Sequence, residues 1–371
     1  MFRIVATDGA ARRGRLETAH GVVETPAFMP VGTLGAVKGL DPLRLAELGA
    51  TIQLANYYHL ALRPGIDAIA ELGGLHAFCG WGGPILTDSG GYQVFSLARL
   101  RRIDAEGVTF RSHLDGAELR LTPERVALDQ GRIGVDVAMV LDECPPWPAS
   151  EEEVAAAVER TTAWARRARR AWQAPASRLF GIVQGGVFPR LRERAARDLV
   201  ELDFDGYAIG GVSVGEPAAD RRRVVEVTAP LLPADRPRYL MGLGTPLDIL
   251  HAVQNGVDLF DCVLPSRNAR HGLLFTPGGP LRIKNARFRD DPRPVDADCP
   301  CPCCRAVSRA FLHHLFRSGE ITAKVLATAH NIRFYLDFAQ ALREAIASGT
   351  MADRAASFTA GYADPSTAQS S

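Results

Sequence analysis

The sequence predicts an α/β protein built as a parallel TIM (β/α)8 barrel, and two observations support this fold. Short apolar segments recur along the chain, and each precedes turn residues and then a longer stretch with helical spacing of its apolar residues. The expected strands cover residues 27–31, 52–55, 85–87, 137–141, 180–183, 207–209, 239–241 and 257–260. Because strands and helices alternate, the strands should pair in parallel, and eight such units close a barrel.

The helices expected between these strands begin close to a proline in most cases, which the first turn of a helix tolerates. They cover residues 41–48, 65–72, 123–132, 151–172, 189–202, 217–232 and 246–255. An open doubly wound sheet is the alternative fold, but no G-x-G-x-x-G fingerprint opens the first helix and no P-loop motif is present. One segment interrupts the alternation: residues 108–122 alternate in polarity around Asp115-Gly116, which predicts a hairpin excursion after the third strand.

The composition excludes several classes of protein. Of the 371 residues 47% are hydrophobic, and 43 basic side chains nearly balance 42 acidic ones, unlike a disordered or collagen-like chain. No apolar run approaches the roughly 18 residues of a membrane helix, and residues 1–11 do not resemble a signal peptide. We therefore expect a soluble, cytoplasmic protein with no membrane partner.

The net charge of +1 hides a strongly basic segment at residues 264–289, which contains no carboxylate. Its six basic residues are Arg267, Arg270, Arg282, Lys284, Arg287 and Arg289. A run of charge is usually only a solvated surface, but this one lacks the interleaved acids of such surfaces. The segment therefore fits binding to the phosphates of a nucleic acid.

Polar residues directly follow several strands, at the end of the barrel where the chemistry of TIM-barrel enzymes lies. Among them are three carboxylates and an amide, Asp88, Asp142, Asp261 and Gln184. One such residue is commonly a turn or a helix cap, but four around one barrel mouth favour a functional site. Two carboxylates and an amide can pair with the edge of a purine-like base, while Tyr92 and Met241 stack on its faces. A third carboxylate is then free for covalent chemistry at an anomeric carbon.

Four of the seven cysteines fall within six positions, which predicts a metal site in a cytoplasmic protein. They are Cys299, Cys301, Cys303 and Cys304, and the histidines that follow are His313, His314 and His330. Structural zinc takes four nitrogen or sulfur ligands, and two adjacent cysteines have difficulty ligating one ion together. We expect three cysteines and one histidine around a structural Zn²⁺. The choice between Cys303 and Cys304, and among the three histidines, stays open at this point.

The motifs at the strand ends also resemble those of a known family, the bacterial tRNA-guanine transglycosylases. The resemblance runs from about residue 3 to residue 348 and rests on residues 87–93 (TDSGGYQ), 181–186 (GIVQGG), 210–216 (GGVSVGE) and 260–265 (FDCVLP), with the Cys-x-Cys-x-x-Cys cluster. It implies a homodimeric pentosyltransferase of queuosine biosynthesis that exchanges guanine at the tRNA wobble position for 7-aminomethyl-7-deazaguanine, the prequeuosine base. The implied route is a double displacement through a covalent ribosyl-aspartate, on a TIM barrel with a zinc-binding insertion before its last helix.

The resemblance also assigns roles, residue by residue. Asp261 would be the nucleophile and Asp88 the general acid/base. The residues implied in base binding are Asp88, Tyr92, Asp142, Gln184, Gly211, Val212, Glu216 and Met241, and those implied in RNA binding are Arg267, Arg270, Lys284, Arg287 and Arg289. One zinc ion per subunit would be held by Cys299, Cys301, Cys304 and His330, and the dimer contacts would include Phe311, His314 and Glu320.

The resemblance has departures and leaves competing functions. Tyr57 stands where the family usually has threonine, and His271 stands where it has asparagine, whereas Cys144 and Val214 follow the bacterial pattern and favour the precursor base over queuine. The alternatives are another TIM-barrel base or sugar hydrolase, and a non-catalytic zinc-containing tRNA-binding subunit, which should lack the nucleophile. The resulting division is a catalytic barrel at 1–276, a basic and zinc-binding subdomain at 277–331, a final barrel helix at 332–348 and a flexible tail at 349–371.

Overall fold

The computed structural model describes residues 1–91, 101–111 and 116–362, and its centre is a ring of eight parallel strands. In ring order these are β4 (Ala27–Pro30), β14 (Leu259–Cys262), β13 (Arg238–Leu240), β12 (Gly206–Ile209), β11 (Arg178–Val183), β10 (Val137–Met139), β6 (Ile85–Asp88) and β5 (Gln53–Asn56). A parallel bridge between Val31 and Leu54 joins the two ends of the sheet, where the Gly32 amide donates to the Leu54 carbonyl over 2.7 Å. The predicted barrel is therefore confirmed, and each expected strand overlaps one strand of the ring.

Helices surround the ring and mostly begin at the predicted capping and proline positions. They are α1 (Pro42–Glu47), α2 (Tyr57–Leu62), α3 (Ile66–Glu71), α4 (Leu75–Cys79), α6 (Pro123–Arg132), α7 (Glu151–Ala171), α8 (Pro189–Val200), α9 (Ala218–Thr228) with η2 (Ala229–Leu231), and α10 (Pro246–Gln254). Helix α7 begins with a capping box, in which Ser150 accepts from the Glu153 amide and Glu153 accepts from the Ser150 amide. None of the described helices combines the length and the apolar character needed to cross a membrane.

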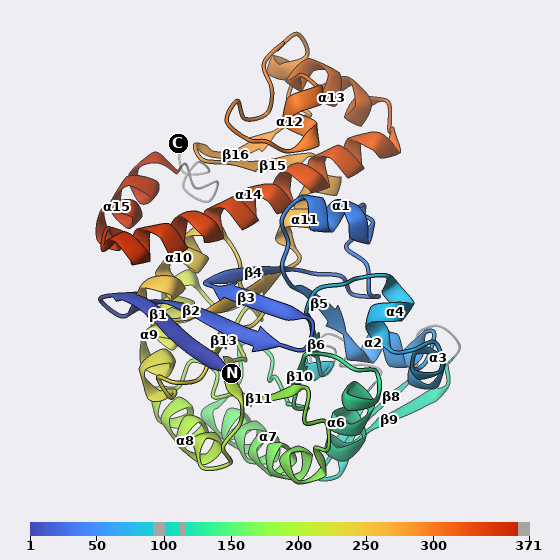
Figure 1. Ribbon diagram of the computed structural model, residues 1–371. Coiled ribbons are helices and arrows are strands. Elements are labelled where there is room, and N and C mark those ends of the chain that lie inside the picture. Colours follow the sequence, from blue (N-terminus) through green and yellow to red (C-terminus); the bar gives the residue numbers. More distant parts are fainter. Residues whose placement is uncertain (92–100, 112–115, 363–371) are drawn as a thin grey trace.

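An antiparallel sheet that the sequence analysis did not predict precedes the barrel (Figure 1). It consists of β1 (Phe2–Asp8), β2 (Ala11–Thr18) and β3 (Gly21–Thr25), and β3 is followed closely by the first barrel strand. Arg12 of β2 contacts Asp258, just before β14, and His20 contacts Asp136, just before β10. The sheet therefore covers the N-terminal ends of the barrel strands, opposite the expected site.

The expected hairpin at 108–122 corresponds to β8 (Gly107–Arg111) and β9 (Glu118–Leu121), which pair antiparallel with Val108 opposite Leu121. Its expected turn residue Asp115 lies outside the described residues. A further strand, β7 (Arg101–Asp104), pairs with the other edge of β8. The indole N–H of Trp164 on α7 donates to the Ala105 carbonyl over 2.9 Å and ties this sheet to the barrel.

The chain after the last barrel strand forms a small subdomain and one long helix across the barrel (Figure 1). The elements are α11 (Leu264–Arg270), β15 (Leu273–Thr276), β16 (Gly279–Arg282), η3 (Ala286–Phe288), α12 (Pro302–Ala306), α13 (Arg309–Arg317), α14 (Ile321–Ser348) and α15 (Met351–Gly361). The expected boundary between residues 331 and 332 falls inside α14, which is continuous because both halves bury apolar or metal-site side chains.

Residues 351–361 form a helix within the predicted flexible tail, whose residues 363–371 lie outside the described part of the chain. Gly349, at φ 69°, ends α14, and α15 follows as far as Gly361. Met351, Ala355 and Phe358 lie on one face of α15 and are buried, and the Phe358 ring packs 4.7 Å from that of Phe338. A helix forms here because the small residues occupy exposed positions between these anchors.

Candidate active site and metal centre

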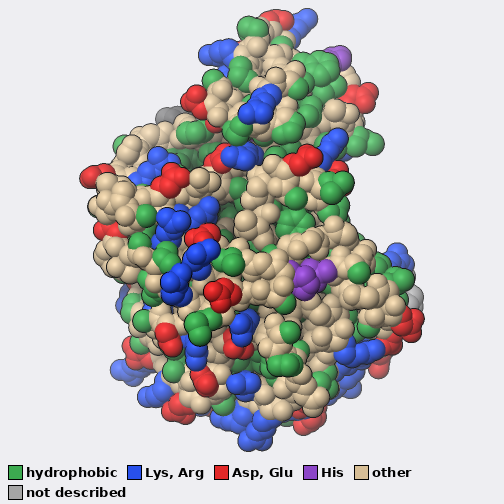
Figure 2. Space-filling view, in the orientation of Figure 1, with side chains coloured by type: hydrophobic (Ala, Val, Ile, Leu, Met, Phe, Trp, Pro, Cys, Tyr) green, Lys and Arg blue, Asp and Glu red, His purple; other side chains and the backbone are tan. Residues whose placement is uncertain are grey.

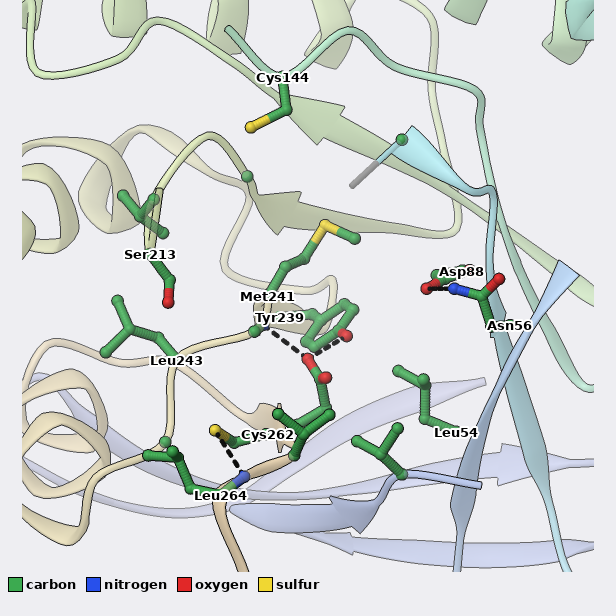
Figure 3. A pocket seen from close by; sticks show the side chains of 18 of the residues that line it. Leu54, Asn56, Asp88, Cys144, Ser213, Tyr239, Met241, Leu243, Cys262 and Leu264 are labelled. Atoms are coloured by element: carbon green, nitrogen blue, oxygen red, sulfur yellow. Dashed lines mark hydrogen bonds between the residues drawn. The ribbon is translucent and has the colours of Figure 1, made fainter. Parts of the chain in front are cut away.

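A cavity of about 560 Å³ opens at the C-terminal ends of the barrel strands. Its lining includes Asn56 at the end of β5, Asp88 at the end of β6, Asp142 after β10, the Gly210-Gly211 segment after β12, and Asp261 in β14. In Figure 3, Asn56 and Asp88 lie on one side of the pocket and Ser213 and Leu243 on the other, with Met241 and Tyr239 between them. The three strand-end carboxylates predicted from the sequence therefore converge on one cavity.

Asp261 is held through one of its carboxylate oxygens. Its Oδ1 accepts a hydrogen bond from the Tyr239 hydroxyl over 2.6 Å and another from the Gly242 amide over 2.7 Å (Figure 3). Burial raises the pKa of Asp261, although these two hydrogen bonds oppose the rise. The other oxygen, Oδ2, has no partner within the described part of the chain, so the carboxylate is oriented and one oxygen is free to react.

Asp88 faces the same cavity with a different environment. Its Oδ2 accepts from the Asn56 side-chain amide over 2.6 Å and its Oδ1 from the Gly90 amide over 3.2 Å. The Asn56 oxygen caps α2 by accepting from the His59 amide, so its NH₂ group is turned toward Asp88. Burial and the nearby charge of Asp261 raise the pKa of Asp88 to about 8. Asp88 can therefore carry a proton near neutral pH.

Asp142 and Gln184 form a wall rich in hydrogen-bond acceptors. Gln184 donates to Asp142 Oδ2 over 2.6 Å, and the Ser89 hydroxyl approaches Asp142 Oδ1 at 3.3 Å. Burial raises the pKa of Asp142 to about 6. The other amide atom of Gln184, Oε1, is buried and has no hydrogen-bond partner among the described residues. Asp142 lines the cavity and can accept N–H groups from a ligand, whereas Gln184 lies behind Asp142 and does not itself line the cavity.

Two glycines leave room for this wall. A Cβ on Gly91 would overlap the Asp142 carboxylate, and a Cβ on Gly211 would overlap Gln184 Oε1. Gly211 also lies in the left-handed region at φ 65°, which disfavours other residues. The glycines at these strand ends therefore allow close contact between the side chains and the adjacent backbone.

The remaining predicted base-binding residues have different positions. Gly211, Val212 and Met241 line the cavity, whereas Tyr92 lies outside the described residues. Glu216 does not line it but is buried behind the loop after β12, where it accepts from the amides of Ser213 (2.6 Å) and Val214 (2.9 Å). Glu216 therefore fixes the backbone of that loop.

The two departures found in the sequence are Tyr57 and His271, and His271 is exposed directly after α11 and does not line the cavity. Tyr57 is fully buried, and its hydroxyl donates to Asp129 of α6 over 2.7 Å, so it does not line the cavity. Cys144 does line it, and burial raises the pKa of its thiol to about 12, which keeps it neutral. The unusual Tyr57 therefore affects helix packing instead of the base-binding walls.

Tyr239 is the main site residue that the sequence analysis missed. We had assigned it only to a strand, yet it orients Asp261. The available signal was the period of two in a strand, which puts Tyr239 on the same side as Met241. The hydroxyl of Tyr239 remains protonated, since burial and the charge of Asp261 raise its pKa well above the usual value.

The basic segment extends from the pocket to the surface of the small subdomain. Arg267 lines the cavity, and Arg270 is partly buried beside it, where burial and the charge of Arg267 lower its pKa. The other four, Arg282, Lys284, Arg287 and Arg289, are exposed farther along the chain. None of the six forms an ion pair with a described residue. Their charges are therefore available to an anionic partner.

The metal-ligand candidates meet between α12 and α14. The Sγ atoms of Cys301 and Cys304 lie 3.7 and 3.3 Å from His330 Nδ1, and these atoms and Cys299 Sγ all lie within 4.8 Å of one another. His330 Nε2 lies 2.8 Å from the Phe275 carbonyl, which directs Nδ1 toward the cysteines. Tetrahedral zinc, with bonds of about 2.0–2.3 Å, separates its ligand atoms by about 3.3–3.8 Å, so this group could hold such an ion.

Cys303 and the other histidines lie outside this group. Cys303 is buried but is not one of the four clustered ligands, and His313 Nδ1 contacts the Ile283 carbonyl at 2.8 Å. Next to His330, Asn331 accepts from the Phe275 amide and donates to the carbonyls of Pro265 and Leu273. The long helix α14 is therefore joined both to the metal centre and to the segment that follows Asp261.

Comparison with known proteins gives one consistent result. A family model described as queuine tRNA-ribosyltransferase matches residues 8–364. Among similar proteins with that name, the one from Aromatoleum aromaticum is 54% identical over 97% of this chain and 98% of its own length. The proteins from Thiobacillus denitrificans and Nitratidesulfovibrio vulgaris are 51% and 53% identical, each over 97% of this chain and over 98% and 97% of their own lengths.

Proposed function

The chain belongs to the queuine tRNA-ribosyltransferase family, which are tRNA-guanine transglycosylases of queuosine synthesis, and from this premise we propose its mechanism and substrate. The enzyme exchanges guanine at the wobble position of tRNA for 7-aminomethyl-7-deazaguanine through a covalent ribosyl-aspartate. The observation that carries the proposal is the convergence of Asp88, Asp142 and Asp261 on one cavity without a cationic partner among the described residues.

The first half-reaction uses Asp261 and Asp88. The target guanosine is extruded from the anticodon loop, because a stacked base cannot reach a pocket at the barrel mouth. The free oxygen of Asp261 bonds to the anomeric carbon while the bond from that carbon to guanine breaks. Asp88, protonated near neutral pH because its pKa is raised, gives its proton to the departing guanine.

The second half-reaction reverses these roles. The precursor base enters the same pocket and gives its ring proton to Asp88, and the ring nitrogen then attacks the anomeric carbon. The bond from the sugar to Asp261 breaks, and two inversions give net retention at the sugar. The hydrogen bonds from Tyr239 and Gly242 stabilise the released Asp261 carboxylate.

The acceptor wall recognises the base. Asp142 can accept N–H groups along its pyrimidine edge, and Met241 packs on its face. We also assign base contact to Gln184, whose buried Oε1 has no hydrogen-bond partner among the described residues. We assign recognition of the aminomethyl group to the loop of Val212, Ser213 and Val214, which Glu216 holds in place. The thiol of Cys144 and the side chain of Val214 support the smaller precursor base over queuine.

The decisive experiment measures incorporation of labelled guanine into a tRNA with a uridine-guanosine-uridine anticodon stretch. Label should enter at the wobble position, and denaturing gels should show a covalent RNA adduct that Asp261→Asn abolishes. Asp220→Asn, which changes a carboxylate on α9 outside the cavity, is the matched control. Release of guanine without incorporation of the label would indicate a hydrolase, and tRNA binding without either reaction would indicate a non-catalytic subunit. A normal adduct rate in Asp261→Asn would refute the nucleophile.

We assign the metal centre to one structural Zn²⁺ held by Cys299, Cys301, Cys304 and His330. With four protein ligands the ion has no open position, so it supplies folding free energy instead of a reacting group. Metal analysis should find one zinc per chain. Cys304→Ser should lose the ion and Cys303→Ser should keep it, and the opposite pattern would overturn the ligand assignment.

We also assign tRNA contact to Arg267, Arg270, Lys284, Arg287 and Arg289. Binding should weaken with salt, and replacing Arg287 and Arg289 together should reduce the slope of log K against log salt by about 0.7–0.9 for each lost phosphate contact. An unchanged slope would remove these two residues from the tRNA interface. Because the proposed substrate is tRNA, we also assign the protein to the cytoplasm.

We assign a homodimer interface to the small subdomain that follows the last barrel strand. Hydrophobic side chains gather on this part of the face in Figure 2, and the ring of Phe311, 48% exposed, stacks on that of His314 at 6.3 Å. Ile321, which follows Glu320 in the sequence, is 74% exposed. Light scattering should report a dimer, and Phe311→Asp should shift it toward monomer; a monomeric wild-type protein would exclude this surface.

A further inference from the structure

Arg192 of α8 is a buried cation close to the base-binding wall. Its side chain is only 1% exposed, and its guanidinium donates to four backbone carbonyls. Nε donates to Gly186 O (2.8 Å), Nη1 to Val183 O (2.9 Å) and Gly210 O (2.7 Å), and Nη2 to Gly211 O (3.3 Å). Burial lowers the pKa of Arg192 to about 10, so it is still charged at neutral pH.

The partners of Arg192 are unusual for a buried arginine. The other arginine that is almost fully buried in the described part of the chain, Arg12, forms a two-pronged ion pair with Asp258. Arg192 has no carboxylate within ion-pair distance among the described residues. The charge of buried Glu216 acts on Arg192 from beyond that distance, but burying a cation without a direct ion pair still costs free energy that a packed apolar side chain would avoid. The presence of a buried arginine at this position therefore indicates that holding the four carbonyls has a function.

These carbonyls lie at the ends of the two strands that build the base-binding wall. Val183 ends β11 directly before Gln184, and Gly210 and Gly211 directly follow β12. In a planar trans peptide, the carbonyl of one residue and the amide of the next point in opposite directions. When Arg192 holds the carbonyls of Gly210 and Gly211, it turns the amides of Gly211 and Val212 away from itself. Gly211 and Val212 line the cavity, and the Gly211 amide hydrogen-bonds the thiol of Cys144, which lines it too.

We propose that Arg192 is a positioning residue, which orients the Gly211 and Val212 amides as donors to the carbonyl oxygen of a purine-like base. The inference rests on the proposed function for the identity of the ligand. It adds that Arg192 contributes to the specificity of the pocket for a base with a carbonyl oxygen. The positive charge also polarises both peptide groups, which strengthens their N–H donors in a site of low dielectric constant. Asp142 and Gln184 Oε1 accept from the base, and the two oriented amides supply the complementary donors.

The test compares two free bases, guanine and 2-aminopurine, which lacks the carbonyl oxygen. Arg192→Met should raise the Kd for guanine about ten-fold or more, because two oriented donors are lost, and should change the Kd for 2-aminopurine by less than about two-fold. Arg190→Met is the matched control, since Arg190 is exposed on the same helix, and it should change neither constant. Calorimetry of the full-length protein measures the dissociation constants of both bases.

Further variants separate positioning from general folding. Arg192→Lys keeps the charge but cannot reach four carbonyls, so it should recover only part of the guanine affinity. Arg192→Ala should regain labelled-guanine exchange when methylguanidinium is added. Equal weakening of both bases, or no change for guanine, would overturn the proposal. If the wild type binds guanine but never incorporates it into tRNA, the proposed function fails while the Kd comparison still tests Arg192.

Discussion

Buried aspartates occur at both ends of the barrel, but their surroundings differ. Under the N-terminal sheet, Asp258 accepts from the Arg12 guanidinium (2.9 and 2.5 Å) and from the Arg238 amide (2.6 Å). Asp136 accepts from the Ile85 amide and from the amide and ring of His20, and its Oδ2 lies 3.0 Å from His76 Nε2. At the opposite end, Asp88, Asp142 and Asp261 have no ion-pair partner within the described ranges.

The difference shows how one residue type serves stability at one end and chemistry at the other. Burial by itself would raise the pKa of Asp136, but hydrogen bonds from His76, the Ile85 amide and His20 outweigh it and lower the pKa to about 2. At the mouth, burial dominates and raises the pKa of Asp88 to about 8. Burial also raises the pKa of Asp258, against its hydrogen bonds from Arg12 and the Arg238 amide, so the contrast in protonation lies between Asp136 and Asp88.

The largest expected effect is a loss of guanine exchange in a variant whose stability is kept. Asp88→Asn should lower the rate of guanine exchange by about 10²–10⁴-fold, because the residue can no longer transfer a proton. The same change should leave the unfolding free energy near the wild-type value at neutral pH, since protonated Asp88 and asparagine are both uncharged there. Asp136→Asn, at the other end, should lower stability and leave the exchange rate of the folded enzyme near wild type. Exchange assays and urea unfolding test both, and a stability loss in Asp88→Asn would break the comparison.

The next effect tests the charged pair beneath the barrel. Arg12→Met leaves Asp258 buried without its partner and should lower the unfolding free energy by about 3–5 kcal/mol. Arg15→Met, on the same strand but with a surface partner in Glu24, should cost at most about 1 kcal/mol. Both variants should keep wild-type exchange rates below their melting temperatures. Similar losses in the two variants would show that burial of the pair is unimportant.

The pH dependence of stability should have opposite signs for Asp88 and Asp136. Between about pH 4 and 8 folded Asp88 keeps its proton, while the unfolded chain loses it near a pKa of about 3.9, so stability falls as pH rises. Folded Asp136 stays ionised down to about pH 2, so its contribution is lost as pH falls from about 4 to 2. Asp88→Asn should reduce the first slope and Asp136→Asn the second, by at most about 1.4 kcal/mol per pH unit. Unchanged slopes in urea titrations would contradict both assignments.

The smallest effect concerns one hydrogen bond. His76→Ala removes a contact with Asp136 at 3.0 Å and the ring that stacks on His20 at 3.5 Å, and should lower stability by about 1–2 kcal/mol. His251→Ala removes a contact with Glu226, which is more than half exposed, and should cost less. Neither change should affect guanine exchange. An activity loss in His76→Ala would show that the two ends are not independent.

The barrel was predictable because each strand is a short apolar run bounded by turn residues and followed by helical spacing. The strand-end residues followed from the topology, since parallel strands bring all their C-terminal ends to one mouth. The N-terminal sheet was not predictable in the same way, because β2 reads ARRGRLET and its arginines obscure an alternation that only pairing with β1 and β3 makes visible.

Finer features depended on three-dimensional contacts. The cysteine spacing predicts a metal site but not which adjacent cysteine turns toward His330, because that is set by the start of α12 at Cys301. Tyr239 looked like an ordinary strand residue, and its hydroxyl acquires meaning only through Asp261. The composition of residues 350–362 predicts a frayed tail, yet the ring of Phe358 packs on that of Phe338 in α14. In each case the missing information is a partner distant in sequence.

Helix α14 connects parts of the protein that the barrel topology keeps apart. His330 faces the metal ligands, and Tyr335, five residues later, donates to the carbonyl of Gly244, which lines the catalytic cavity. The metal-ligand group and the pocket are therefore both joined to α14, through His330 and Tyr335, which lie little more than one helical turn apart. Opening of the metal subdomain must propagate to the pocket loop, so amide hydrogen exchange at residues 242–245 should accelerate whenever the ion is removed. Under the zinc assignment proposed above, retention of the ion should set how long each molecule keeps a competent active site.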